Sequence, residues 1–404
     1  MAVLKGKHVL LGVTAGIAAY KSAFLIRLFI KAGAKVKVVM TPAAKDFVTP
    51  LTLSTLSKNE VLFSFTQEEN PDLWNNHVEL GLWADLFVIA PATANTLSKM
   101  VSGNSDNFLL ATYLSAKCPV YFAPAMDLDM YQHPSTKNSL EKLQSFGNKM
   151  IAATSGELAS GLIGEGRMAE PEQIVSFVEK DLLAQLPLNG KKIMITAGPT
   201  YEAIDPVRFV GNHSSGKMGF ALAETAANLG ANIILISGPT AMKLEHPLVE
   251  IIPVVSAEEM YRAAHEHYDS VDAAIAAAAV SDFKPTKVAS QKIKKEGDSK
   301  MTIEFERTRD ILYSLGEKKK HQLLVGFALE TENELENAKK KLKKKNLDFI
   351  VLNSLNDPGA GFQKDTNKVK IISASETVEF GLKPKKEVAR DILFEIFKIP
   401  PHES

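Results

Sequence analysis

Short runs of apolar residues recur along the chain, with segments of helical periodicity between them. In the first half these runs predict strands at 8–11, 35–40, 85–90 and 120–123, with helices at 18–32 and 93–102. In the second half they predict strands at 192–195, 232–236, 273–279, 323–327 and 349–352. Alternating strands and helices form parallel sheets covered by helices on both faces. We therefore predict an α/β fold of doubly wound, mainly parallel sheets.

The alanine-rich run at 276–279 is ambiguous, because alanine has the highest helix propensity. It leads into Ser281-Asp282 and a proline-containing loop. A parallel sheet places its ligand site where strands end in such loops, so we assign this run to a strand.

The two halves of the chain open in the same way. Residues 4–16 and 188–198 each contain Gly-Lys, a short apolar run and then Thr-Ala-Gly. This is the pattern of a first buried strand that meets a loop. We therefore expect two domains, 1–188 and 189–404.

Composition and charge narrow the class of protein. The chain has 404 residues, of which 45% are hydrophobic and 23% charged, so each half can bury a core of its own. Lys+Arg and Asp+Glu both number 47, and this balance argues against nucleic acid or an anionic membrane as partner. Cys118 is the single cysteine, which excludes an intramolecular disulfide and fits a reducing compartment. With no signal-peptide pattern and no membrane-spanning run, we expect a soluble, cytoplasmic enzyme.

Small, hydroxylated or glycine-containing loops follow three predicted strands of the first half, at 12–22, 40–47 and 91–96. Backbone N–H groups at helix N-termini, together with Ser and Thr hydroxyls, suit a phosphate monoester. The first loop departs from GxGxxG, which disfavours an NAD-dependent oxidoreductase. Each loop alone is more often an ordinary turn; their combination indicates a site.

The segments Asn76-His77-Val-Glu-Leu, Trp83-Ala-Asp85, Ile89-Ala-Pro-Ala-Thr-Ala-Asn-Thr96 and Pro124-Ala-Met126 together resemble the FMN-containing cysteine decarboxylases. The resemblance covers most of residues 6–180 and implies a flavodoxin-like domain that binds FMN. In that family the substrate thiol is oxidised to a thioaldehyde, which acts as the electron sink for loss of carbon dioxide. The resemblance assigns flavin contacts to Gly16, Thr41, Phe47, Ala90, Thr93, Asn95, Thr96 and Met126.

The same resemblance makes His77 the catalytic base, a role that suits an imidazole because histidine titrates near neutrality. The alternative is a histidine that only caps a helix. Two positions depart from the family. Asp127 replaces the usual Asn, and Ser160 replaces a Cys in the substrate-clamping flap of residues 155–168. A serine hydroxyl is a much weaker acid than a thiol, so Asp127 either supplies the final proton or merely bonds backbone amides at its turn.

A second motif opens the other half: Thr196-Ala-Gly-Pro-Thr, followed by Arg208-Phe-Val-Gly-Asn212-His-Ser214-Ser-Gly216-Lys217-Met-Gly219. It lacks Walker spacing, but the helix predicted at 220–229 supplies an N-terminus for anion binding. The string closely resembles the phosphopantothenate–cysteine ligases, over about residues 190–397. That resemblance implies a Rossmann-like domain.

Other segments extend the second resemblance. It implies nucleotide contacts at Ser214, Gly216, Lys217, Ala276, Ala277, Ala278, Asp282, Lys292, Arg309, Asp310, Ile311, Leu312, Phe327, Lys341 and Lys345. Asp282 would bind ribose or Mg²⁺. Lysine runs such as 339–345 are most often solvated helix faces, but Lys341 and Lys345 are four apart and share one face.

The implied reactions form a sequence. The carboxylate of 4'-phosphopantothenate attacks the α-phosphate of CTP, and the amino group of cysteine captures the acyl nucleotide. Asn212 contacts that intermediate and Lys292 belongs to the catalytic loop. The product, phosphopantothenoylcysteine, is then decarboxylated by the first half. The residues alone do not show whether CTP or ATP is the nucleotide used. The alternatives are a ligase fused to a flavin domain that no longer decarboxylates, and a non-catalytic flavoprotein. Related flavin domains form trimers and related ligase domains form dimers, so we expect a higher homo-oligomer.

Overall fold

The computed structural model describes residues 2–66, 72–158, 160–294, 301–330, 333–354 and 365–400. The chain divides into two compact units, Met1–Leu183 and Ala184–Ser404. This division lies five residues before the boundary expected at 188. The first unit ends with helix α8 (Pro171–Ala184), and Leu188 is already buried in the core of the second unit. Among the described residues, no helix has the length and apolar content needed to cross a bilayer.

The first unit is built on a six-stranded sheet in which every neighbouring pair is parallel. Its order is β3-β2-β1-β4-β5-β6. The strands are β1 His8–Val13, β2 Lys35–Met40, β3 Val61–Leu62, β4 Leu86–Ala92, β5 Val120–Pro124 and β6 Lys149–Met150. Four of these strands were predicted, and the doubly wound α/β fold is confirmed.

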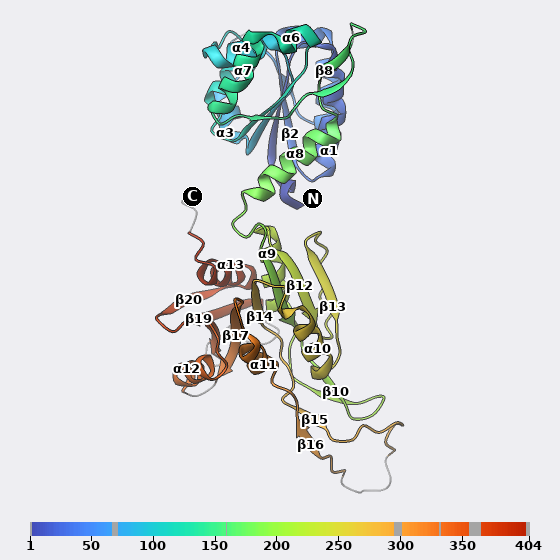
Figure 1. Ribbon diagram of the computed structural model, residues 1–404, viewed down its shortest axis with the longest axis vertical. Helices are drawn as coiled ribbons and strands as arrows, with labels where there is room; N and C mark the ends of the chain where they lie inside the picture. Colours follow the sequence, from blue (N-terminus) through green and yellow to red (C-terminus); the bar gives the residue numbers. More distant parts are fainter. Residues whose placement is uncertain are drawn as a thin grey trace. The chain divides into compact units, whose positions relative to one another are not determined.

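Helices cover both faces of this sheet (Figure 1). Apolar side chains of α1 Ser22–Lys31, α2 Pro50–Ser57 and α8 share one core cluster. The second cluster holds side chains from α3 His77–Trp83, α4 Ala94–Ser102, α5 Phe108–Ser115 and α7 Pro134–Ser145. The shorter elements are η1 Ala2–Leu4, η2 Ile17–Lys21, η3 Pro42–Asp46 and α6 Leu128–Gln132. The helix predicted at 18–32 is therefore divided, because Ala19 N–H bonds Gly16 C=O and begins a tighter 3-10 turn.

The second unit has an eight-stranded sheet of order β13-β12-β9-β14-β17-β18-β19-β20, whose last two strands are antiparallel. The strands are β9 Lys192–Ala197, β12 Asn232–Ser237, β13 Val249–Pro253, β14 Ala273–Ala276, β17 Leu323–Glu330, β18 Phe349–Ser354, β19 Thr366–Ile372 and β20 Thr377–Pro384. One face packs against α9 Lys217–Asn228 and α13 Lys385–Ile396, which lie side by side in Figure 1. The other face packs against α10 Ala257–Tyr268, α11 Ile311–Lys318 and α12 Glu334–Lys344.

Several predicted elements have different ends in the structure, and two of them matter for the second unit's site. Strand β14 stops at Ala276, three residues before the predicted end. The next N–H groups still bond the end of β9 and the residues after it: Ala277 bonds Thr196 C=O, Ala279 bonds Gly198 C=O, and an isolated parallel bridge joins Ala279 to Pro199. Helix α9 begins at Lys217, three residues earlier than predicted, because Gly216 caps it with a φ of 74°.

Three antiparallel hairpins project from the sheets. The first unit carries β7 Thr154–Glu157 with β8 Ile163–Arg167. The second unit carries β10 Tyr201–Ala203 with β11 Phe209–Gly211, and β15 Phe283–Pro285 with β16 Phe305–Arg307.

Candidate active sites

In the first sheet the strand order reverses between β1 and β4, the point where doubly wound sheets bind ligands. A cavity of about 1040 Å³ lies there, and we call it the first cavity. Its lining includes six of the eight predicted flavin residues: Gly16, Thr41, Thr93, Asn95, Thr96 and Met126. The residues come from loops that follow β1, β2, β4 and β5, so the strand-end rule brings them together.

Hydroxyl groups organise the part of the first cavity formed by β1 and β4. Thr14 Oγ1 donates to Pro91 C=O at 2.7 Å and accepts from Thr93 N–H at 3.2 Å. Thr93 Oγ1 donates to Thr96 Oγ1 at 3.3 Å in the first turn of α4. Thr41 Oγ1 is buried and has no hydrogen-bond partner among the described residues. The first cavity thus has an unsatisfied hydroxyl and a helix N-terminus, which suit an oxygen-rich ligand.

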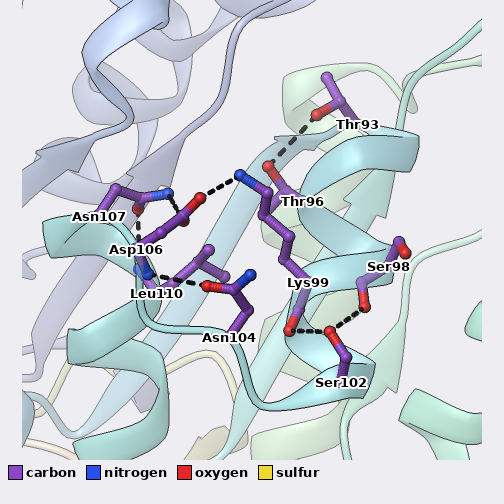
Figure 2. A network of polar contacts seen from close by, with 9 residues as sticks. All are labelled: Thr93, Thr96, Ser98, Lys99, Ser102, Asn104, Asp106, Asn107 and Leu110. Carbon is purple, nitrogen blue, oxygen red and sulfur yellow. Dashed lines mark hydrogen bonds and ion pairs between the residues drawn. The ribbon is translucent and has the colours of Figure 1, made fainter.

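A polar network between α4 and α5 forms another part of the wall (Figure 2). Lys99 on α4 pairs with the carboxylate of Asp106. Asn104 Oδ1 accepts from Asp106 N–H at 3.0 Å, and Asn107 Oδ1 caps α5 by accepting from Leu110 N–H at 3.1 Å. These bonds hold the α4–α5 connection rigid where it meets the first cavity.

The β7–β8 hairpin meets the turn after β5 at the first cavity. Ser160 Oγ donates to Asp127 Oδ1 at 3.0 Å, and Leu128 N–H donates to the same oxygen at 2.7 Å. Met126 N–H also donates to Gly166 C=O at 3.0 Å. Asp127 therefore caps α6, and it accepts one bond from a backbone amide at its turn and one from the Ser160 hydroxyl.

Three residues assigned to the flavin half do not line the first cavity: His77, Phe47 and Ala90. His77 is the first residue of α3, whose cap is the neighbouring Asn76. Its ring makes edge contacts with Phe65 and Phe108, and its Nδ1 is buried without a partner among the described residues. Phe47 is exposed, and Ala90 is fully buried within β4. His77 thus lies outside the lining that includes Asp127 and Ser160.

In the second sheet the order reverses between β9 and β14. A smaller cavity of about 180 Å³ lies there, and we call it the second cavity. Six predicted nucleotide residues line it: Ser214, Gly216, Lys217, Ala277, Ala278 and Phe327. The N-terminus of α9 opens into this space, and Lys217 pairs with Asp365 at 2.6 Å. Burial, followed by the nearby Lys217 charge, lowers the pKa of Lys385, which also lines the second cavity.

The other nine predicted nucleotide residues lie outside that lining: Ala276, Asp282, Lys292, Arg309, Asp310, Ile311, Leu312, Lys341 and Lys345. Asp310 caps α11, and its carboxylate pairs with Lys345 at 2.8 Å, so α11 and the end of α12 meet. Arg309 lies over the Tyr261 ring.

The loop that carries Lys292 is anchored by its neighbour, because Ile293 N–H donates to the buried Asp205 carboxylate at 3.2 Å. Asn212 Nδ2 donates to Val280 C=O at 2.8 Å. Asn212 and the end of the alanine-rich segment are therefore in contact, although neither of these two residues lines the second cavity.

The comparisons with known proteins cover both units. Residues 2–183 match the Flavoprotein family, and residues 188–399 match the C-terminal domain of the DNA/pantothenate metabolism flavoproteins. The chain is 48% identical to the coenzyme A biosynthesis bifunctional protein CoaBC of Bacillus subtilis (strain 168), over 98% of this chain and 97% of that protein. It belongs to the CoaBC family of bifunctional enzymes.

One further relative and one solved structure are also similar to this chain. A cysteine/cysteine sulfinic acid decarboxylase from an unknown prokaryotic organism is 54% identical over 87% of this chain and 99% of its own length. The crystal structure of a CoaBC C-terminal domain is 48% identical, covers 53% of this chain and 98% of its own, and has a TM-score of 0.46.

A flavin suits the first cavity of this CoaBC family member. The volume is that of a typical cofactor site, and the buried Thr41 hydroxyl lacks a partner. A Cβ at Gly16 would lie 3.4 Å from Thr93 Cγ2, so glycine leaves room for a ligand beside that threonine. In the second unit, no group of three His, Cys, Asp or Glu side chains able to hold a metal occurs among the described residues. Any Mg²⁺ would therefore need phosphate oxygens as ligands beside a single carboxylate such as Asp282.

Several cavity residues have no signal in the sequence. Lys99 and Asp106 line the first cavity, whereas Asn367 and Lys385 line the second. They come from helices, the α4–α5 connection and an antiparallel strand rather than from the ends of parallel strands. Asn353, in the second cavity, is the exception, because it directly follows the predicted strand 349–352 and the strand-end rule could have found it.

Proposed function

We propose that residues 189–404 join 4'-phosphopantothenate to cysteine at the expense of CTP, through an acyl cytidylate. Residues 1–188 then decarboxylate the product, phosphopantothenoylcysteine, to 4'-phosphopantetheine with FMN as cofactor. The observation that carries the proposal is that six of the eight flavin residues and six of the fifteen nucleotide residues line cavities at the two sheet reversals. Membership of the CoaBC family supports the same pair of reactions.

In the first cavity, Gly16, Thr41 and the α4 N-terminus around Thr93–Thr96 would hold FMN, with their N–H and hydroxyl groups directed to its polar atoms. FMN, when bound, supplies reversible two-electron oxidation of the substrate thiol. Another part of the first cavity is lined by Met126 and Asp127, on the turn after β5, and by Ser160 on the β7–β8 hairpin. They would contact the cysteine end of the substrate and exclude water from it.

His77 acts as the base from a neighbouring copy in this proposal. Within one chain it is separated from the cavity lining, although its Nδ1 is buried and without a described partner. A homo-oligomer that placed α3 of one copy beside the first cavity of another would complete the site. Mixing His77→Asn with Asp127→Ala protein would test this, because mixed oligomers contain some intact sites and should decarboxylate faster than either variant alone.

In the second unit, the N-terminus of α9, Ser214 and Lys217 would bind the phosphates of CTP, with Lys385 as a second cation. Mg²⁺ would be held by those phosphates together with Asp282, which is exposed at the start of β15. Asn212 would contact the acyl cytidylate, and Lys292 would neutralise charge that develops on the phosphates.

The decisive experiment measures both half-reactions on the full chain. CTP with 4'-phosphopantothenate and cysteine should release pyrophosphate, and omission of cysteine should leave an acyl cytidylate that mass spectrometry detects. Carbon dioxide release is measured with phosphopantothenoylcysteine as substrate. It is also measured with two rival substrates, free cysteine and cysteine sulfinate, because one relative is named as a decarboxylase of these compounds. Faster release from either rival, or no CTP-dependent pyrophosphate, would refute the proposal. The purified protein should also show the absorption band of bound FMN.

One observation favours a second candidate, an active ligase fused to a flavin domain that does not decarboxylate. The Ser160 hydroxyl replaces the family's thiol and donates to Asp127. Pyrophosphate release without carbon dioxide release would establish this alternative.

A further inference from the structure

A buried lysine lies at the first cavity, in a position that the proposed chemistry does not use. Lys21 is the last residue of η2, and its side chain is 5% exposed. Its Nζ donates to Met168 C=O at 3.2 Å and to Glu170 Oε1 at 3.0 Å. A buried ammonium is costly unless it is fully bonded, so these contacts define its position closely.

Glu170 connects the lysine to two further elements. Its Oε1 also accepts from Arg167 Nη2 at 2.9 Å, and Arg167 is the last residue of β8. Its own C=O accepts from Ile174 N–H at 3.0 Å, in the first turn of α8. The hydrogen bond from Lys21, opposed by partial burial, holds the pKa of Glu170 below its usual value, so the carboxylate is charged at neutral pH.

Lys21 therefore joins two segments that are far apart in the sequence, the loop after β1 and the stretch between β8 and α8. The 3-10 turn η2 begins at Ile17, next to Gly16, in the loop that lines the first cavity. The β7–β8 hairpin lines the same cavity through Glu157, Ser160 and Gly166. The far end of the hairpin is held by Ser160 on Asp127, and its base by the Lys21 contacts with Met168 and Glu170.

We propose that Lys21 is a positioning residue that fixes the base of the β7–β8 hairpin against the Gly16 loop, so that the hairpin covers substrate in register with the flavin. The consequence for activity rests on the proposed decarboxylation, whereas the anchoring itself does not. Loss of the ammonium releases the hairpin and weakens substrate binding. It leaves the fold intact, because Glu170 keeps Arg167 as a partner and can reach solvent.

The test compares Lys21→Met with Lys149→Met in the full-length flavin-loaded protein. Lys149 forms another partly covered ion pair of the first unit, with Asp181, but does not line the first cavity. Hydrogen–deuterium exchange of amides 155–167 should become about tenfold faster in Lys21→Met and stay unchanged in Lys149→Met. For carbon dioxide release from phosphopantothenoylcysteine, KM should rise about tenfold, while kcat changes less and flavin content does not change. Lys21→Arg keeps the positive charge and two or more hydrogen-bond donors, so its KM should lie close to the wild-type value.

Unchanged hairpin exchange in Lys21→Met would overturn the proposal, as would an effect of equal size in Lys149→Met. If Lys21→Met fails to fold, Glu170→Gln decides the matter: faster exchange confined to 155–167 supports the anchor, and wild-type exchange refutes it. Absence of carbon dioxide release in the wild type would refute the proposed decarboxylation only, because the exchange measurement would still decide whether Lys21 anchors the hairpin.

Discussion

Gly219 lies where α9 approaches the sheet most closely, and its replacement by alanine tests how the second cavity is built. A Cβ at this position would lie 2.5 Å from Ala197 Cβ and 3.0 Å from Ala197 Cα, at the end of β9. Carbon atoms pack at about 3.5–4.0 Å, so the start of α9 must move by about 1 Å. Gly219 is the third residue of the helix, and the displacement therefore carries Gly216 and Lys217 with it.

The stability cost of Gly219→Ala is small because two effects oppose each other. Overpacking costs about 1–3 kcal/mol, whereas the higher helix propensity of alanine returns up to about 1 kcal/mol. The effect on ligation should be larger, since a 1 Å misplacement of positioning groups costs about a hundredfold in rate. We expect kcat/KM for CTP-dependent pyrophosphate release to fall about a hundredfold, with thermal unfolding only a few degrees lower.

Gly381→Ala is the matched control, because a Cβ there meets nothing within 4 Å and the residue lies in β20 of the same unit. It should ligate at the wild-type rate. Carbon dioxide release from added phosphopantothenoylcysteine should be unchanged in both variants, since the first cavity belongs to the other unit. Wild-type ligation by Gly219→Ala, or a loss explained by unfolding of the second unit, would refute the reasoning.

Four other variants and one alkylation reaction test individual residues. His77→Asn should abolish carbon dioxide release and leave pyrophosphate release intact; unchanged decarboxylation would remove this residue from the site. Asn212→Asp should slow ligation at least about tenfold and accumulate acyl cytidylate, because a carboxylate would face both Val280 C=O and an anionic intermediate; normal turnover would contradict that. Ser160→Ala should retain appreciable decarboxylation, whereas Asp127→Ala should slow it or accumulate the oxidised enethiol, and the opposite pattern would exchange the two roles. Burial raises the pKa of Cys118 from 9.0 to about 11, so iodoacetamide at pH 8 should alkylate it about a hundredfold more slowly in the folded protein than in urea, as followed by intact mass.

Some of the site could be predicted because it follows from strand order. Thr41, Thr93 and Met126 lie within three residues of the ends of predicted parallel strands, and the carboxyl ends of such strands meet at one edge. Lys99 and Lys385 had no comparable signal. A lysine within or at the start of an amphipathic helix is normally solvated, and only the packing of other segments around it makes it part of a cavity.

The sequence alone determined the two-domain α/β architecture, most strand positions and the motifs that indicate the CoaBC family, because hydrophobic periodicity and turn residues act over a few neighbouring positions. Tertiary structure alone decided which of those residues share a cavity. It joined Ser160 to Asp127 and Lys21 to Glu170 across long stretches of chain, and it left His77 outside the lining of the first cavity. Such contacts depend on the packing of whole elements against one another, and no local pattern in the chain records that packing.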